Sequence, residues 1–190
     1  MKKLFALLLA LVMMLSLAAC GSSEETTVSD VAVAMVTDYG DITDQSFNQT
    51  TYEACKEFCE AEGLTFEYFK PATDSDDDRI AMIENAIDSG YNVIVMPGFA
   101  FANAIISTAD NYPEVKFVAL DVSEFDLTGN GWTIPENVYS AVYQEEISGY
   151  FAGYAAVKLG YTKLGYCGGM AVPAVLRFGY GFLQGADAAM

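Results

Sequence analysis

Residues 31–49, VAVAMVTDYGDITDQSFNQ, decide the fold class of this chain. The first six residues are all apolar, which is typical of a strand buried on both faces of a sheet. A polar loop rich in aspartate follows, and residues 47–63 then carry a helical pattern that ends at a glycine. Strand, polar loop and helix in this order form the beginning of a βαβ unit.

The same unit recurs along the 190-residue chain. Apolar runs rich in β-branched residues predict further strands, and helical patterns separate them. We predict strands at residues 64–69, 92–96, 116–120, 138–142 and 163–167, and helices at 78–89, 100–111 and 145–159. This alternation predicts an α/β protein with a doubly wound parallel sheet, in which ligands bind at the carboxyl ends of the strands.

The N-terminus has the features of a bacterial export signal. A basic start is followed by the apolar residues 4–19, a run shorter than the ~20 residues that span a bilayer. The sequence LAAC at 17–20 resembles the lipobox of bacterial lipoproteins, which implies cleavage after residues 1–19 and lipid attachment at Cys20. Residues 20–30 would be a flexible tether to the extracytoplasmic face of the cell membrane. The alternative is an ordinary cleaved signal with a chance cysteine.

Composition excludes several classes of function. The chain has 26 acidic and 9 basic residues, a net charge of −17, which repels phosphate backbones and argues against nucleic-acid binding. It contains no histidine, so a His-based triad and a His-ligated zinc site are excluded. Cys55 and Cys59 read as small buried apolar residues, and the acid-rich residues 74–78 as a helix start rather than a calcium site. We expect no metal and no cofactor.

The loop after the first strand carries the strongest candidates for ligand binding. Asp38, Asp44, Phe47 and Asn48 place carboxylates, an aromatic ring and a carboxamide at one helix N-terminus. This combination suits a flat ligand that forms hydrogen bonds. The alternative for Asp44 or Ser46 is a simple helix cap.

Later strand ends supply three further candidates. Gly98 and Phe99 follow the third strand, where the glycine permits a close backbone approach to a ligand. Asp121 directly follows the fourth strand, at the edge where parallel sheets bind ligands. Phe101 is at least as well explained as a core residue. The glycines at 179, 181 and 185 are best explained by close helix packing.

Residues 37–49 resemble the opening motif of the basic membrane lipoproteins, with Asp41 in place of the family's second glycine. Residues 146–156, 163–170 and 177–182 match the family as well. The resemblance implies a two-lobed, type I periplasmic-binding-protein-like fold and a substrate-binding protein of an ABC importer for purine nucleosides. It also implies that Phe47 and Phe178 stack on the base, Asp38 or Asp44 serves as carboxylate partner, and Asn48 contacts the base edge. The alternative for Phe178 is a core aromatic that opens its helix.

The resemblance also implies a domain organisation. Residues 31–143 would form the N-terminal lobe and residues 144–190 the start of a C-terminal lobe, with a hinge near 141–144. Family members are about twice as long, so we expect a C-terminally truncated chain that binds ligand weakly or not at all. An ABC permease and its ATPase are the implied partners. The alternatives are a receptor for a sugar or small signalling molecule, a surface hydrolase, and an adhesive lipoprotein; we expect no enzymatic activity.

Overall fold

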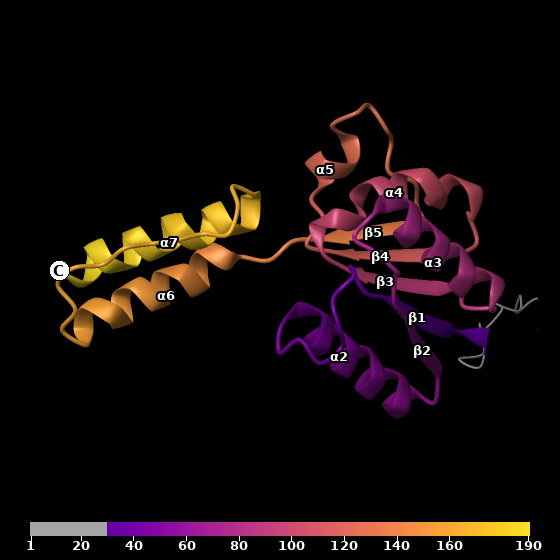
Figure 1. The fold of residues 1–190 in the computed structure, drawn as a ribbon, viewed down its shortest axis with the longest axis horizontal. Helices are drawn as coiled ribbons and strands as arrows, with labels where there is room; N and C mark the ends of the chain where they lie inside the picture. Colours follow the sequence, from indigo (N-terminus) through magenta and orange to yellow (C-terminus); the bar gives the residue numbers. More distant parts are fainter. Residues whose placement is uncertain (1–29) are drawn as a thin grey trace, which may run out of the picture. The chain divides into compact units, whose positions relative to one another are not determined.

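The computed structural model describes residues 30–190, which contain a single five-stranded parallel sheet. The strand order is β2-β1-β3-β4-β5, and every neighbouring pair is parallel (Figure 1). The strands are β1 Ala32–Val36, β2 Thr65–Phe69, β3 Val93–Pro97, β4 Lys116–Leu120 and β5 Val138–Ala141. The α/β fold with a parallel sheet that the sequence predicts is confirmed.

The strand order reverses at β1, since the chain first adds β2 on one side and then β3 on the other. The carboxyl ends of β1 and β3 therefore form the switch point at which open α/β sheets bind ligands. The helices are α2 Phe47–Glu62, α3 Asp76–Asp88, α4 Ala102–Thr108, α5 Glu124–Thr128, α6 Glu145–Lys158 and α7 Pro173–Ala189, with 3-10 turns at Phe99–Phe101 and Ala109–Asn111.

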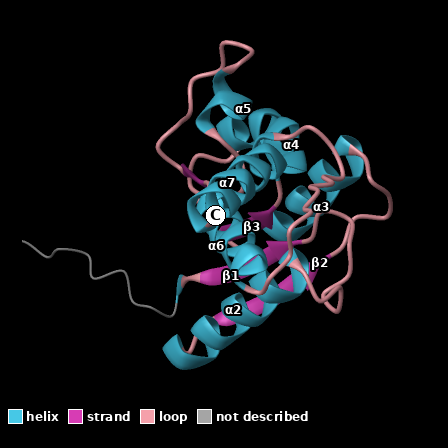
Figure 2. Ribbon diagram, turned by 90° about the vertical axis from the view of Figure 1, so that its left-hand side faces the viewer, coloured by secondary structure: helices cyan, strands magenta, loops and turns pink. Residues whose placement is uncertain are grey.

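Helices cover both faces of the sheet (Figure 2), and each face has its own hydrophobic core. Val33 and Val95 pack with Cys59 of α2 on one face, and Cys59 is 1% exposed, as its interpretation as a buried apolar residue requires. On the other face, Met96 and Phe117 pack against α3 and α4. Alternate residues of each strand thus face opposite layers, which explains why the strands are apolar throughout.

Helices α6 and α7 pack on each other rather than on the sheet (Figure 1). A methyl group on Gly181 would lie 2.0 Å from the carbonyl oxygen of Glu146, and one on Gly149 would lie 2.2 Å from that of Phe178. Glycines on both helices therefore allow the two backbones to touch. The interpretation of Gly181 and Gly185 as close-packing residues is confirmed.

Two predicted elements differ from the structure, and one helix was not predicted. Residues 163–167 are not a strand but part of the irregular link between α6 and α7, because a parallel strand needs a neighbour and residues 144–190 contain no other strand. Helix α7 begins at Pro173, five residues before Phe178. Helix α5 was not predicted; it begins with a capping box in which Ser123 and Asp126 exchange hydrogen bonds.

The predicted signal segment 1–19 and Cys20 lie outside the described residues, as does the tether except for its last residue. Within residues 30–190, none of the helices combines the length and apolar character needed to cross a membrane. The lobe boundaries at 31–143 and 144–190 stay a prediction.

Candidate functional site

The loop after β1 is organised around one carboxylate. Asp38 Oδ1 accepts hydrogen bonds from the backbone N–H groups of Tyr39 at 2.6 Å and Gly40 at 2.7 Å. The side-chain amide of Asn48 also donates to Asp38 Oδ1, at 2.9 Å, and to Asp44 Oδ2, at 3.0 Å. The structure therefore brings Asp38, Asp44 and Asn48 together in one hydrogen-bonded cluster.

Asn48 is 4% exposed and uses its whole amide within the protein. Both hydrogens of Nδ2 go to the two aspartates, and Oδ1 accepts from the backbone N–H of Asp38 at 3.3 Å. A base-edge contact by Asn48 thus requires one of these bonds to be replaced. In this structure Asn48 braces the loop.

Asp44 caps helix α2 as well as binding Asn48. Its Oδ1 accepts from the backbone N–H groups of Ser46 at 2.7 Å and Gln49 at 3.2 Å, whereas the Ser46 side chain caps nothing. Burial raises the pKa of Asp44, but the hydrogen bonds from Asn48 and Ser46 outweigh it and leave the pKa below its ordinary value.

Arg79 binds the loop after β1, a role that was not predicted from the sequence. Its Nε donates to the carbonyl oxygen of Asp38 at 3.1 Å, and its guanidinium pairs with Asp74 and Asp76. It lies 5.9 Å from the ring centroid of Phe101, which is fully buried and therefore a core residue. The signal was present in the sequence as one arginine directly after five acid-rich residues at the start of α3.

Gly98 lies beside Asp38 at the switch point of the sheet. Its φ of +126° is a conformation that side chains rarely adopt, and a Cβ at this position would lie 3.8 Å from the Cβ of Asp38. The ends of β1 and β3 therefore meet as the doubly wound topology predicts.

A cavity with a volume of about 520 Å³ lies beside the carboxyl ends of β4 and β5. It brings together three residues singled out from the sequence, Phe47, Asp121 and Phe178, with Tyr143 and Glu145 beside them. Phe47 and Tyr143 pack edge to face, with ring centroids 5.9 Å apart at 81°. A cavity of this size is typical of small-molecule sites. The residues around it do not include Asp38, Asp44, Asn48 or Gly98.

Asp121 stands in a strained backbone conformation at the end of β4. Its φ is +60°, which is uncommon for a residue other than glycine, and its N–H donates to the carbonyl oxygen of Ala141 at 2.7 Å. Burial raises the pKa of Asp121, the charges of Glu145 and Asp126 add to this effect, and Arg177 opposes it. The carboxyl therefore binds a proton more readily than an exposed aspartate does.

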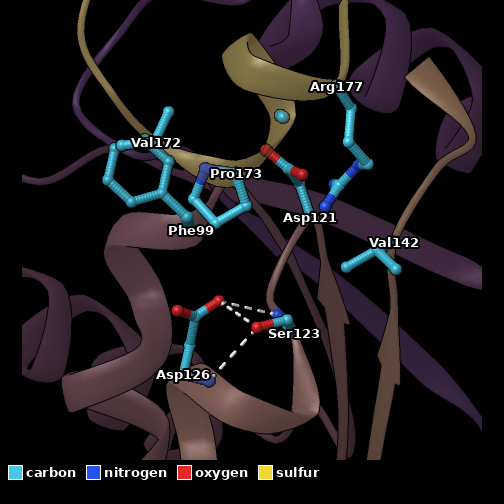
Figure 3. A pocket seen from close by; sticks show the side chains of 9 residues that line it. Phe99, Asp121, Ser123, Asp126, Val142, Val172, Pro173 and Arg177 are labelled. Atoms are coloured by element: carbon cyan, nitrogen blue, oxygen red, sulfur yellow. Dashed lines mark hydrogen bonds between the residues drawn. The ribbon is translucent and has the colours of Figure 1, made fainter. Parts of the chain in front are cut away.

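A smaller cavity of about 90 Å³ adjoins the first and shares Asp121 with it. Phe99 and Arg177 line it, as does the capping box of Ser123 and Asp126 (Figure 3). Arg177 is in a stretch that the sequence analysis matched to the family without assigning a role to it. Among residues 30–190, no cluster of three or more cysteine, aspartate or glutamate side chains is arranged to hold a metal ion.

The sequence of this chain matches a known protein family. Residues 31–189 match the family model Bmp, described as ABC transporter substrate-binding protein PnrA-like. The "ABC transporter nucleoside-binding protein BmpA" of Lactococcus lactis is 32% identical over 94% of this chain and 51% of its own length. A "CD4+ T-cell-stimulating antigen" of Listeria innocua is 29% identical over 98% of this chain and 54% of its own length. The chain thus spans about half the length of the curated relatives it matches.

Solved structures agree on the fold. A solute-binding protein of an ABC transporter system from Conexibacter woesei is 27% identical, with a TM-score of 0.66 over 84% of this chain and 51% of its own. A solute-binding protein from Actinobacillus succinogenes with bound D-allose has a TM-score of 0.60 at 15% identity over 83% of this chain and 55% of its own, which supports the fold alone. Both of these structures are solute-binding proteins of ABC transporters, and the match covers about half the length of each.

Two independent comparisons by sequence cover almost all of the described chain, and the solved structures share its parallel sheet. The chain belongs to the Bmp family of PnrA-like substrate-binding proteins of ABC transporters.

Proposed function

We propose that this chain recognises the base of a purine nucleoside in the cavity between Phe47 and Phe178, as part of the substrate-binding protein of an ABC importer. The observation that carries this proposal is the meeting of two phenylalanines and Asp121 in one cavity, although they come from three distant parts of the chain. The relative named for nucleoside binding supports the choice of ligand.

The chemistry of the cavity suits a flat, neutral, hydrogen-bonding ligand. Stacking of a base on an aromatic side chain contributes about 1–3 kcal/mol by alanine substitution. Asp121 can accept hydrogen bonds from ring or exocyclic N–H groups, and a hydrogen bond to a charged group contributes about 1.5–3 kcal/mol. The carboxylates of Asp121 and Glu145 disfavour an anionic ligand, so a nucleoside fits better than a nucleotide.

The wider role extends beyond the described residues. We infer that Cys20 carries a lipid that anchors the protein at the extracytoplasmic face of the membrane, and that a permease with its ATPase receives the ligand. One acyl chain gives only marginal membrane binding, so the proposed anchor needs more than one. Mass spectrometry of the membrane-associated chain tests this step: the expected result is a lipid-modified N-terminal peptide that begins at Cys20, and an unmodified one contradicts it.

Ligand-perturbed NMR spectra of the 190-residue chain in mild detergent test the binding step. We expect guanosine and adenosine to shift the ring resonances of Phe47 and Phe178, with a dissociation constant of about 1 mM, equivalent to about −4 kcal/mol. Guanosine 5′-monophosphate is the matched charged control and is expected to bind more weakly. Shifts produced by D-glucose or D-ribose, with none from the nucleosides, would favour a sugar receptor and overturn the proposal.

A further inference from the structure

Several carboxylates and one basic side chain line the two adjoining cavities. Asp121, Glu145 and Asp126 contribute carboxylates, whereas Arg177 is the sole basic residue among the described side chains that line either cavity. A single cation among three carboxylates controls the electrostatics of its surroundings. The position of Arg177 therefore determines which of these carboxylates it attracts.

Glu145 fixes the guanidinium group of Arg177. The Nε of Arg177 donates to Glu145 Oε2 at 2.5 Å, and the Glu145 side chain is 7% exposed. Glu145 is the first residue of α6, where the helix dipole favours a negative charge. Burial raises the pKa of Glu145, but the hydrogen bond from Arg177 outweighs it and leaves the pKa below its ordinary value. The pair thus stays ionised at neutral pH and holds Arg177 at the start of α6.

Arg177 also faces Asp121 at the end of β4. Both side chains extend into the smaller cavity, from α7 and from the sheet respectively (Figure 3). Glu145 and Asp126 repel the charge of Asp121, and Arg177 is the neighbour that attracts it. Arg177 therefore provides an attraction of unlike charges between α7 and the sheet.

Phe178 is the next residue on α7. Successive residues of a helix point about 100° apart, so the side chains of Arg177 and Phe178 leave the same turn of α7 in different directions. Arg177 lines the smaller cavity while Phe178 lines the larger one with Phe47. The glycine contacts pack α6 and α7 backbone to backbone. An interaction that holds Arg177 therefore also fixes the direction in which Phe178 points.

We propose that Arg177 is a positioning residue that joins α7 to the carboxyl end of β4 through Glu145 and Asp121, and so sets Phe178 opposite Phe47 as the second wall of the ligand cavity. The role concerns the arrangement of the cavity without ligand; it rests on the proposed function only for what the cavity binds.

The test follows Asp121 and Phe178 by NMR in the 190-residue chain with no nucleoside present. The groups that face Asp121 are Glu145 from α6, Arg177 from α7, Asp126 from α5 and Tyr143 from the segment between β5 and α6. Because Arg177 is the neighbour that lowers the pKa of Asp121, Arg177→Gln is expected to raise that pKa and to shift the ring resonances of Phe178.

Lys163→Gln is the control, since it removes one positive charge from the exposed link between α6 and α7. It is expected to change neither signal. Arg177→Lys keeps the charge and is expected to return the Asp121 titration toward that of the unmodified chain. A merely structural role for Arg177 predicts no such rescue. An Arg177→Gln chain in which both signals stay unchanged, or a Lys variant identical to the Gln variant, overturns the proposal.

Asp121→Asn removes the same attraction between unlike charges from the sheet side and covers the case in which Arg177→Gln does not fold. Asparagine tolerates the positive φ at this position. We expect the ring resonances of Phe178 to shift in this variant too, and unchanged resonances in the folded chain overturn the proposal.

Guanosine titrations separate this proposal from the proposed function. If both hold, Arg177→Gln weakens guanosine binding about tenfold. If the ligand assignment alone is wrong, guanosine leaves the unmodified chain unchanged while Asp121 and Phe178 still respond to Arg177→Gln. If the positioning role alone is wrong, guanosine binds the unmodified chain and neither signal responds to the substitution.

Discussion

Phe47 has a structural contact and a proposed ligand contact on the same ring. It packs edge to face against Tyr143 and lines the cavity with Phe178. Loss of a stacking face removes about 1–3 kcal/mol, so Phe47→Ala is expected to weaken guanosine binding by about tenfold or more. The measurement is the NMR titration of the 190-residue chain. Phe58→Ala, on the same helix at a 57% exposed position, is the matched control and should bind as the unmodified chain does.

Arg79 is a buried arginine that pairs with carboxylates, and its loss should lower the stability of the fold. Its side chain is 5% exposed and donates to the carbonyl oxygen of Asp38, whereas its partners Asp74 and Asp76 are 64% and 43% exposed. Water can solvate those carboxylates when the arginine is gone, so Arg79→Ala is expected to cost about 1–3 kcal/mol of unfolding free energy. Urea unfolding measures it.

Lys56→Ala is the control for Arg79. Lys56 pairs with Glu60 on the surface of α2, with side chains 51% and 70% exposed, and such a pair contributes about 0–1 kcal/mol. Equal losses in the two variants would contradict the role assigned to Arg79.

The Glu145 carboxyl gives stability a defined dependence on pH. Its folded-state pKa lies below the ordinary value, despite burial, because Arg177 donates to it. The unfolded chain therefore binds this proton more readily, so the stabilisation is complete above the ordinary glutamate pKa of about 4.3 and is lost as pH falls through the folded pKa.

Glu145→Gln tests this dependence in urea unfolding measured between about pH 7 and pH 3. The variant should lose less unfolding free energy across the acid range than the unmodified chain does. A parallel pH dependence in the two chains would exclude Glu145 as a source of the acid sensitivity. Asp121 has the opposite sign, since its raised pKa makes protonation favour the folded state.

At the scale of elements, the contact between α6 and α7 depends on glycine. A methyl group on Gly181 would meet the backbone carbonyl of Glu146 at 2.0 Å, and backbone cannot move aside as a flexible side chain can. Gly181→Ala is therefore expected to lower the unfolding free energy by at least about 1–3 kcal/mol, the usual cost of overpacking.

Gly165→Ala is the matched control, because this glycine is exposed and a methyl group there meets nothing within 4 Å. Circular dichroism during urea unfolding compares the two variants. If Gly181→Ala unfolds at the same urea concentration as Gly165→Ala, the two helices do not pack as closely as described.

The elements that the sequence predicted correctly are those whose signal is local. The strand at residues 31–36 is apolar because α2 and α3 cover opposite faces, and that pattern is visible without its neighbours. Residues 163–167 are also partly apolar. A strand, however, requires a neighbouring strand to which it can form hydrogen bonds, and residues 144–190 contain no strand. Pairing is a property of the whole sheet, so local composition could not reveal its absence.

At the scale of the whole molecule, the site depends on convergence from remote positions. Phe47, Asp121 and Phe178 were candidates because each follows a strand or belongs to a family motif, and they line one cavity. Asn48 shows the limit of such reasoning, since its amide type suggested ligand contact while its hydrogen bonds are all internal. Arg177, Glu145 and Tyr143 were missed as site residues because only the folded arrangement brings them to the cavity.

The central claim is that a purine base lies between Phe47 and Phe178. Intermolecular nuclear Overhauser effects between guanosine and the 190-residue chain test it most directly, because they report proximity even when binding is weak. The account predicts that the base proton H8 shows contacts to both phenylalanine rings. Guanosine contacts confined to other residues, with neither Phe47 nor Phe178 in reach of the base, would contradict it.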